Sequence, residues 1–250
     1  MPLETISRMA SFFCLIAESS AGLLIGNDAR AEGGVLEINQ SCVATGCFPG
    51  DAPGFPVEIT QSGSYRMTSS LSQFFAGFGG GVVNAIDIHR SFVQIDMNGF
   101  LIACTAVLSD SCPGSADGIS LSGGSFENPI GDITVENGTV TGMPGSGIYL
   151  PVGGAVIRNV RVVNNGEHGI DTSTFFATGS IVENSLARGN GSDGIRLGFG
   201  GLVRGSVSTD NGANSITGVG GFLGQPSGAG YTECVTQGPT DGIEDLGSNS

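Results

Sequence analysis

The dipeptide Gly-Ile recurs along the middle of the chain, each time at a fixed distance from a preceding Asn or Gly. It stands at 118–119, 147–148, 169–170 and 194–195, with Ser215-Ile216 as a variant. Ten residues separate an Asn or Gly from the start of each of the last four pairs: 137 to 147, 159 to 169, 184 to 194 and 205 to 215. The intervening segments run 19, 12, 15 and 11 residues. One half of the repeat is therefore constant in length, and the other half carries insertions.

A repeat of 21 to 29 residues is too short to bury its own apolar side, so neighbouring repeats must stack on one another. In such a stack the strands lie about 4.8 Å apart, and equivalent side chains form columns. We expect an inward column of Ile119, Ile148, Ile170, Ile195 and Ile216, followed two residues later by Leu121, Leu150 and Leu197. We also expect a ladder of side-chain amides at a turn, formed by Asn137, Asn159 and Asn184.

The composition agrees with this arrangement. The 44 Gly would suit a collagen or a disordered linker, but no Gly-X-Y period is present and 39% of the residues are hydrophobic. Val, Ile, Thr, Ser, Asn and Gly dominate, which favours short strands joined by tight turns. Leu is too sparse for a leucine-rich repeat, and the nine-residue period of a calcium-binding roll is absent. The sequence therefore predicts an all-β solenoid, a parallel β-helix, with an N-terminal cap that covers its first strand edges.

From about residue 86 to 216, and on to Gly242-Ile243, these repeats resemble the right-handed parallel β-helix of the pectin-lyase-like superfamily. The stretch "IDMNGFLI" (95–102) is similar to an early coil of uncharacterised secreted bacterial members. The stretch "PVEITQSGSYRMTSSL" (56–71) is similar to the segment that leads into their first coil. Because the superfamily contains lyases, hydrolases, epimerases, tailspikes and adhesins, the resemblance implies a fold and not a reaction.

The first 31 residues have the features of an export signal. Arg8 precedes an apolar run from 9 to 17, a second run covers 21 to 26, and Ala29-Arg30-Ala31 offers small residues for cleavage. Neither run approaches the ~20 residues that span a bilayer, so no transmembrane segment is expected. Because Glu4 and Glu18 depart from a standard signal, the alternative is a loosely attached helix on a cytoplasmic protein.

Three segments follow from these observations. We assign 1–31 to a signal peptide, 32–85 to an N-terminal cap with lead-in strands, and 86–250 to the coils, with a truncated last coil. The mature protein is expected to be secreted, periplasmic or located on the cell surface.

The cysteines agree with export. Cys42 and Cys47 close "CVATGC", and Cys104 and Cys112 close "CTAVLSDSC". In an exported chain such local pairs predict disulfides. A metal site is the alternative, but no histidine stands near either pair and the Cys-x-x-Cys spacing of zinc sites is absent. Cys234 is left without a predicted partner.

Two rows of outward side chains follow from the repeat. Strand residues alternate between faces, so the residue after each Ile points outward: Ser120, Tyr149, Asp171, Arg196 and Thr217. A turn residue precedes each Gly or its Ser variant: Asp117, Ser146, His168, Asp193 and Asn214. Because neighbours in a row are one coil apart, we expect one patch that contains Tyr149, His168, Asp171, Asp193 and Arg196.

The residue types of this patch suit acid–base chemistry on a uronic acid. Uronate lyases and epimerases of the superfamily use a base, an acid, and an Arg or calcium that neutralises the carboxylate, because removing the adjacent proton builds negative charge. By that resemblance Tyr149 and His168 form the acid–base pair and Arg196 holds the substrate carboxylate. Because Asp171 and Asp193 flank His168 and favour its protonated form, Tyr149 beside Arg196 is the expected base. The remaining polar positions are assigned to substrate binding: Asp117, Ser120, Asp171 and Asp193. The one candidate cofactor is a calcium ion between Asp171 and Asp193.

A simpler interpretation remains open. Outward positions on a solenoid are polar because they face water, and Asp-Gly or His-Gly is ordinary turn chemistry. His89, in "IDIHRS", is interpreted as a solvated strand residue. The net charge of −14 disfavours nucleic acid and anionic membranes as partners.

Three functions are therefore compatible with the sequence. The first is a lyase or epimerase that acts on an extracellular polysaccharide. The second is a non-catalytic, adhesive protein that binds a surface glycan, and the third is a purely structural solenoid.

Overall fold

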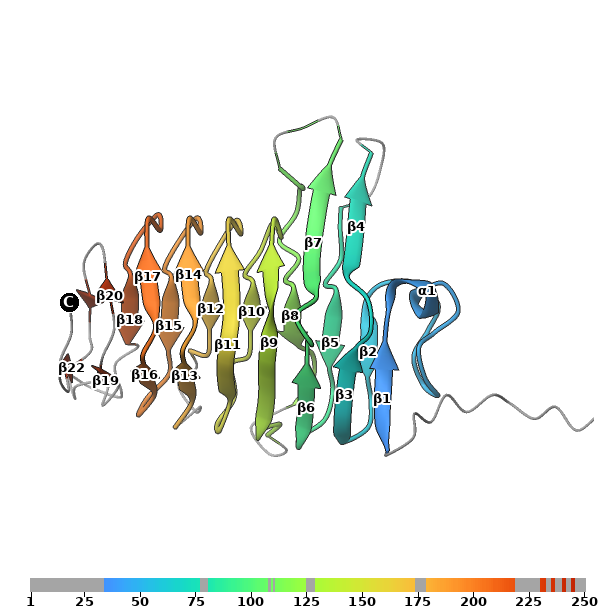
Figure 1. The fold of residues 1–250 in the computed structure, drawn as a ribbon, viewed down its shortest axis with the longest axis horizontal. Helices are drawn as coiled ribbons and strands as arrows, with labels where there is room; N and C mark the ends of the chain where they lie inside the picture. Colours follow the sequence, from blue (N-terminus) through green and yellow to red (C-terminus); the bar gives the residue numbers. More distant parts are fainter. Residues whose placement is uncertain are drawn as a thin grey trace, which may run out of the picture.

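The computed structural model describes residues 34–76, 81–107, 109, 111–124, 129–173 and 179–218, and the backbone of four short strands between residues 230 and 245. Short strands stack as successive coils along one long axis (Figure 1). Every pairing between the described strands is parallel. The predicted all-β solenoid is therefore confirmed.

The described strands form two sheets. The eight-stranded sheet runs in the order β2 (Val57–Ile59), β5 (Ile86–Ile88), β8 (Ile119–Leu121), β10 (Ile148–Tyr149), β12 (Ile170–Asp171), β15 (Ile195–Leu197), β18 (Ile216–Gly218) and β21 (Thr240–Asp241).

The fourteen-stranded sheet has a main path and a branch. The main path is β1 (Val35–Ile38), β3 (Gly63–Met67), β6 (Val93–Asp96), β9 (Ile133–Thr141), β11 (Val156–Val163), β13 (Ile181–Glu183), β16 (Leu202–Arg204), β19 (Gly230–Thr232) and β22 (Glu244–Asp245). The branch strands are β4 (Leu71–Phe75), β7 (Leu101–Ala106), β14 (Leu186–Arg188), β17 (Val207–Thr209) and β20 (Val235–Thr236).

The predicted isoleucine column is confirmed. Each isoleucine pairs with the next across the eight-stranded sheet and is fully buried: Ile119, Ile148, Ile170, Ile195 and Ile216. The Gly before each of the first four isoleucines is needed because the coils approach closely there. A Cβ added to Gly169 would collide with the carbonyl oxygen of Gly194. In the second predicted column, Leu150 and Leu197 are fully buried, whereas Leu121 is only partly buried.

The Asn or Gly at the start of each constant half of the repeat forms a corner of the coil. Asn137, Asn159 and Asn184 adopt φ values of 62°, 54° and 49°, and Gly205 adopts 58°. This left-handed conformation is tolerated by Asn and Gly and strained for most other residues. It breaks the alternation of faces, so that Val135, two residues before the corner, and Gly138 and Val140, one and three residues after it, are all buried.

The predicted amide ladder at these corners is only partly present. Asn159 donates to Oδ1 of Asn137 at 3.3 Å, but Asn137 donates to Asp96, and no described hydrogen bond joins Asn184 to Asn159. The reason is exposure. Asn159 and Asn184 lie on the outside of the corner, where water competes for their amides.

A continuous amide ladder lies instead inside the coils, at the turn before Gly-Ile. Asn165 donates from Nδ2 to Oδ1 of Asn190 at 3.0 Å, and Asn190 donates in the same way to Asn211 at 3.0 Å. Asn165 and Asn190 are each only 2% exposed. Asn190 also donates to the carbonyl of Val162 at 3.1 Å. Sequence analysis missed this ladder, although each Asn begins an Asn-Gly pair four residues before the Gly-Ile position.

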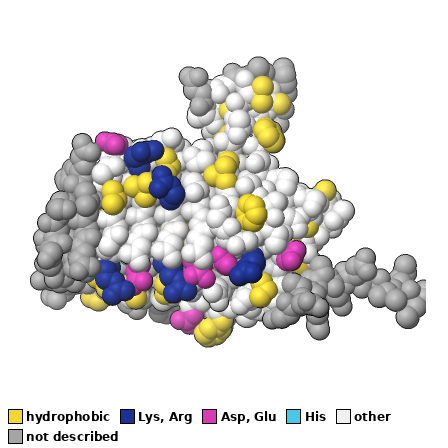
Figure 2. Space-filling model, in the orientation of Figure 1, with side chains coloured by type: hydrophobic (Ala, Val, Ile, Leu, Met, Phe, Trp, Pro, Cys, Tyr) yellow, Lys and Arg dark blue, Asp and Glu magenta, His cyan; other side chains and the backbone are white. Residues whose placement is uncertain are grey.

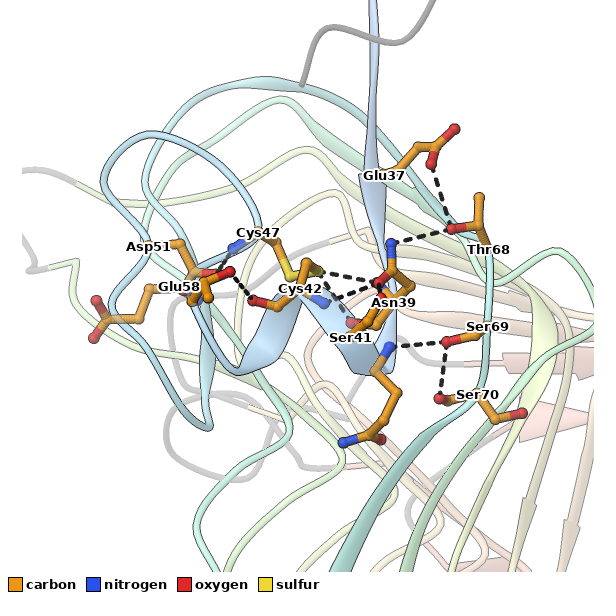
Figure 3. Close-up of a disulfide and its surroundings, with 12 residues drawn as sticks. Glu37, Asn39, Ser41, Cys42, Cys47, Asp51, Glu58, Thr68, Ser69 and Ser70 are labelled. Carbon is orange, nitrogen blue, oxygen red and sulfur yellow. Dashed lines mark hydrogen bonds between the residues drawn. A yellow bond between two sulfur atoms is a disulfide. The ribbon is translucent and has the colours of Figure 1, made fainter. Parts of the chain in front are cut away.

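The N-terminal end is covered by β1, the single-turn helix α1 (Gln40–Val43) and the Cys42–Cys47 disulfide (Figure 3). Asn39 caps the helix by accepting from the Cys42 amide at 2.9 Å. The Asp51 carboxylate ties this cap to the first coil, because it accepts from the amides of Cys47 at 2.7 Å and Glu58 at 2.8 Å. The predicted cap and its disulfide are both present.

The coils begin earlier than the predicted boundary at residue 86. Strands β2, β3 and β4 already pair in register with β5, β6 and β7, so the first complete coil starts at Val57. Part of the segment assigned to lead-in strands, 32–85, is therefore solenoid. At the other end Thr240 pairs with Ile216. Gly242-Ile243, the predicted signal at 1–31 and Cys234 lie outside the described residues.

Strands β4 and β7 extend beyond the body of the stack (Figure 1). The predicted Cys104–Cys112 disulfide joins β7 to the chain that follows it. Phe74 and Val107 on this extension are 72% and 64% exposed. No helix in the described part of the chain is long and apolar enough to cross a membrane.

The main path of the fourteen-stranded sheet carries a ladder of ion pairs on its outer surface. Three Arg residues contact an acid on the neighbouring coil, whereas the exposed Arg161 on β11 has no acidic partner among the described residues; the pairs are Arg66 with Asp96, Arg158 with Glu136, and Arg204 with Glu183. Figure 2 shows acidic and basic side chains alternating along the lower part of this face. The charges within these three pairs therefore neutralise one another.

Replacing Asn190 by Ala should remove the middle rung of the buried ladder. The main-chain amide of Asn165 and the carbonyl of Val162 would lose a partner, so we expect the free energy of unfolding to fall by about 2–4 kcal/mol. Urea unfolding followed by circular dichroism measures this loss. The control is Asn159→Gly, at an exposed corner that glycine adopts without strain. A loss for Asn190→Ala no larger than that of the control would contradict the role given to the ladder.

Candidate functional site

The outer surface of the eight-stranded sheet carries the predicted row of side chains that follow the isoleucines. The strand register places them side by side on successive coils: Ser120, Tyr149, Asp171, Arg196 and Thr217. Glu58 and Asp87 extend this outer row toward the N-terminal cap. The predicted order of the row is therefore confirmed.

The predicted turn row is also present, and each of its residues stands three positions before a residue of the outer row. Its backbone carbonyls accept hydrogen bonds from the glycine amides of the preceding coil: Gly118 to Ser146, Gly147 to His168, Gly169 to Asp193, and Gly194 to Asn214. Coil stacking therefore brings the two rows together in one patch.

Arg196 contacts two other members of the patch, Asp171 and His168. Its Nη1 lies 3.4 Å from Oδ2 of Asp171 and 3.4 Å from Nε2 of His168. Asp171 is buried, with 3% exposure, and its other oxygen accepts from the Ser173 amide at 2.7 Å. The Arg196 side chain remains 36% exposed. A buried carboxylate therefore orients a guanidinium that solvent, or a ligand, can still reach.

His168 lies between groups of opposite charge. Its Nδ1 accepts from the Asp193 amide at 3.2 Å and lies 3.5 Å from Oδ2 of Asp193. A neutral imidazole accepts at one ring nitrogen only, so the Asp193 amide and the Arg196 guanidinium compete for it. A protonated ring could donate to Asp193 but would place a second positive charge beside Arg196. His168 therefore contacts Asp193 through one ring nitrogen and Arg196 through the other.

Asp117 is a stronger acid–base candidate than sequence analysis indicated. Its Oδ1 accepts from the Ser146 amide at 2.7 Å, and its Oδ2 accepts from the Ser120 hydroxyl at 3.2 Å. The pKa of Asp117 is raised to about 6, chiefly by burial; the hydrogen bonds from Ser146 and Ser120 lower it, and the charges of Glu167 and Asp87 raise it. Assigned only to substrate binding, Asp117 thus has a pKa that suits proton transfer near neutral pH.

The pKa of Tyr149 is shifted in the direction that disfavours a role as a base. Burial is the largest cause that raises its pKa above the ordinary value; Asp171 and Asp117 add to the shift, and Arg196 opposes it. The phenol therefore keeps its proton at neutral pH. No described group forms a hydrogen bond with its hydroxyl, which suits Tyr149 to donating a proton or a hydrogen bond to a ligand.

Asp171 and Asp193 do not by themselves form a calcium site. Among the described residues there is no group of three or more His, Cys, Asp or Glu side chains placed to hold a metal ion. The carboxylate of Asp171 faces the Arg196 cation, and Oδ1 of Asp193 accepts from Asn214 at 3.0 Å. Calcium prefers six to eight oxygen ligands, and this set does not fit it.

The second histidine was interpreted wrongly. His89 follows β5, and its Nε2 is buried with no hydrogen-bond partner among the described atoms. It is therefore not a simple solvated strand residue. Residue type alone does not reveal this burial, because it is set by the residues of neighbouring coils.

Comparison with known proteins gives one family and one similar structure. A family model described as "right handed beta helix region" matches residues 87–228, and no curated protein matches the chain. The A-module of mannuronan C-5 epimerase AlgE4 from Azotobacter vinelandii is similar in structure, with a TM-score of 0.48 and 15% sequence identity. The similarity covers 86% of this chain and 63% of that module, so this chain corresponds to less than two thirds of its length.

Asp117→Asn should change how stability depends on pH. The pKa of Asp117 is about 6 in the folded protein against an ordinary value of 3.8. A raised folded pKa means that the group's contribution to stability is full below the ordinary value and is lost as pH rises through 6. Because Asn stays neutral, the variant should gain stability relative to the parent between pH 4 and 7, by about 1–3 kcal/mol after allowance for partial exposure. Thermal or urea unfolding over this range measures the difference, and a constant or falling difference would refute the assignment.

Proposed function

Because the chain belongs to the right-handed β-helix family, we propose that it binds an extracellular polysaccharide along the outer surface of its eight-stranded sheet. Successive coils repeat about every 4.8 Å along such a stack. A surface that repeats in one direction suits an extended polymer of repeating units better than a compact small molecule. The same proposal includes export of the chain through residues 1–31. Two disulfides support it, because such bonds persist in oxidising compartments.

We further propose that the patch catalyses lyase or epimerase chemistry on a uronic acid unit. The observation that carries this proposal is the cluster of Tyr149, His168, Asp171 and Arg196 on adjacent coils, with Arg196 within 3.4 Å of both His168 and Asp171. An acid, a base and a cation are the three groups that proton removal beside a carboxylate requires. Three outward Arg residues on the main path of the fourteen-stranded sheet lack this combination, because each is paired with an acid: Arg66, Arg158 and Arg204.

In the proposed reaction the base removes the proton at C5 of the uronate, and the electron pair moves toward the carboxylate. Arg196 stabilises the charge that develops there. In a lyase the bond from C4 to the glycosidic oxygen then breaks, a C4=C5 double bond forms, and Tyr149 protonates the departing oxygen. In an epimerase C5 takes a proton back on the opposite face and no bond to oxygen breaks.

The structure changes the roles first assigned to individual residues. The raised pKa of Tyr149 supports an acid rather than a base, which leaves His168 in its neutral form, or the carboxylate of Asp117, as the base. Asp171 positions Arg196, and Ser120 and Asp193 position Asp117 and His168.

Glycan binding without turnover is the second candidate function. It is favoured by the pairing of Arg196 with Asp171, because a neutralised guanidinium binds hydroxyls and carboxylates yet stabilises developing charge less strongly. No described contact favours a purely structural role.

A panel of polysaccharides that contain uronic acids tests the proposal. Unsaturated product is followed by ultraviolet absorbance, C5 exchange by deuterium uptake from heavy water, and binding by bound mass. Tyr149→Phe should lower turnover about 10²- to 10⁴-fold with binding retained, because only the proton is lost. Arg196→Gln should weaken both. The matched control is Arg204→Gln, which breaks an ion pair on the opposite sheet and should leave both unchanged.

The outcomes separate the candidates. Binding without unsaturated product or exchange would establish the second candidate and refute catalysis. Equal turnover in the parent and both patch variants would refute the assigned site. A parent protein that neither binds nor changes any member of the panel would refute the proposed function.

A further inference from the structure

A cavity of about 580 Å³ opens on the first coils, away from the patch. Its lining comes from the segments that follow β2, β5 and β8, together with one residue before β9: Thr60, His89, Arg90, Ser122, Gly123, Gly124 and Ile130. None of these residues belongs to the proposed acid–base site. The cavity is therefore a separate feature of the molecule.

The cavity lies on the same outer surface as the patch. The His89 amide donates to the carbonyl of Ile59 at 2.9 Å, and the Ser122 amide donates to that of Ile88 at 2.9 Å. Pairing of the strands thus continues past their ends and sets Thr60, His89 and Ser122 side by side. Since they follow the outer row by two residues, they form a second row facing the same way.

The chemistry of the lining favours an anion. Arg90 is the one formal charge among the described residues that line the cavity, and none of those residues carries a carboxylate, although the whole chain carries a net charge of −14. Arg90 is exposed and has no acidic partner among the described residues; its Nη1 contacts only the His89 carbonyl, at 3.4 Å. The nearest acids of the outer row are Glu58 and Asp87, and Asp87 is held by Asn84 at 2.8 Å.

The other lining side chains suit a saccharide. The His89 ring forms part of the cavity wall, and its Nε2 is buried without a hydrogen bond to the described atoms. Thr60 and Ser122 add hydroxyls, and Ile130 adds an apolar wall that the face of a sugar ring can cover.

We infer that this cavity binds an acidic saccharide unit and that Arg90 recognises its anionic group, a carboxylate or a sulfate ester. The inference rests on the proposed function for the saccharide, and the anion follows from the lining. His89 directly follows β5, and Tyr149 lies on β10, two coils further along. The two residues are therefore about 10 Å apart along the stack. One oligosaccharide can therefore occupy the cavity and the patch together, so that the cavity selects acidic chains for the patch.

Histidine NMR tests this inference, because the sequence has only two histidines. In the untagged, ¹⁵N-labelled full chain, the imidazole signals of His89 report the cavity and those of His168 report the patch. The probes are glucuronate, glucose 6-sulfate and neutral glucose. We expect at least one anionic probe to shift the His89 signals in a saturable way, and glucose to bind at least tenfold more weakly.

Two arginine variants assign the effect. Arg90→Gln should weaken the response of His89 at least tenfold, since a charge-assisted contact is lost. Arg196→Gln should leave the His89 titration unchanged while altering that of His168, and the control Arg204→Gln should leave both unchanged. A response to glucuronate alone identifies a carboxylate site, and a response to glucose 6-sulfate alone identifies a sulfate site.

Three results would overturn the inference: equal affinity for glucose and the anionic probes, an unchanged His89 response in Arg90→Gln, or no His89 response to any probe. Failure of the proposed function is seen separately. It would appear as absent polysaccharide binding and turnover, whereas the His89 titration reports the cavity alone.

Discussion

Main-chain hydrogen bonding between successive coils is the interaction on which the rest of the structure depends. Because all described strands are parallel and in register, each coil satisfies the amides and carbonyls of its neighbour, and equivalent side chains stack. A shift of one residue would turn the isoleucine column toward solvent and the outer row toward the core. The register therefore decides both the core and the surface that carries the candidate site.

Two polar features hold this register, the corners and the buried amide ladder. Both occur in the half of the repeat whose length is constant. The corners at Asn137, Asn159 and Asn184 reset the alternation of faces. The buried ladder through Asn165 and Asn190 then ties one turn to the next. Buried amides are stable only when each finds a partner, so an extra residue between corner and ladder would leave several unpaired. Insertions instead enter after the strands of the eight-stranded sheet, where they can project outward.

The same stacking distributes charge unevenly between the two sheets. On the main path of the fourteen-stranded sheet three outward Arg residues meet an acid on the adjacent coil, as Arg158 meets Glu136, and the charges of these pairs cancel. On the eight-stranded sheet the described outer row contains one cation, Arg196, among several acids and hydroxyls. Arg90 lies beside the cavity and has no acidic partner among the described residues. The proposed acid–base patch and the cavity therefore lie on the same face of the solenoid.

The sequence by itself determined the features that repeat. The isoleucine column, the outer row from Ser120 to Thr217 and the stacking of Tyr149 beside Asp171 follow from two local rules, the two-residue alternation of a strand and the return of the chain to the same place in each coil. The two disulfides were predictable for a similar reason, because each pair closes a short loop.

Only the tertiary structure decided which polar groups are buried and what they face. The pKa of Asp117, the unpartnered Nε2 of His89 and the ladder through Asn190 could not be predicted from residue type. Nor could the start of the coils at Val57, which depends on pairing with β5. Desolvation and hydrogen bonding at these positions depend on residues of neighbouring coils more than 20 positions away in the sequence, and the spacing of one strand carries no information about them.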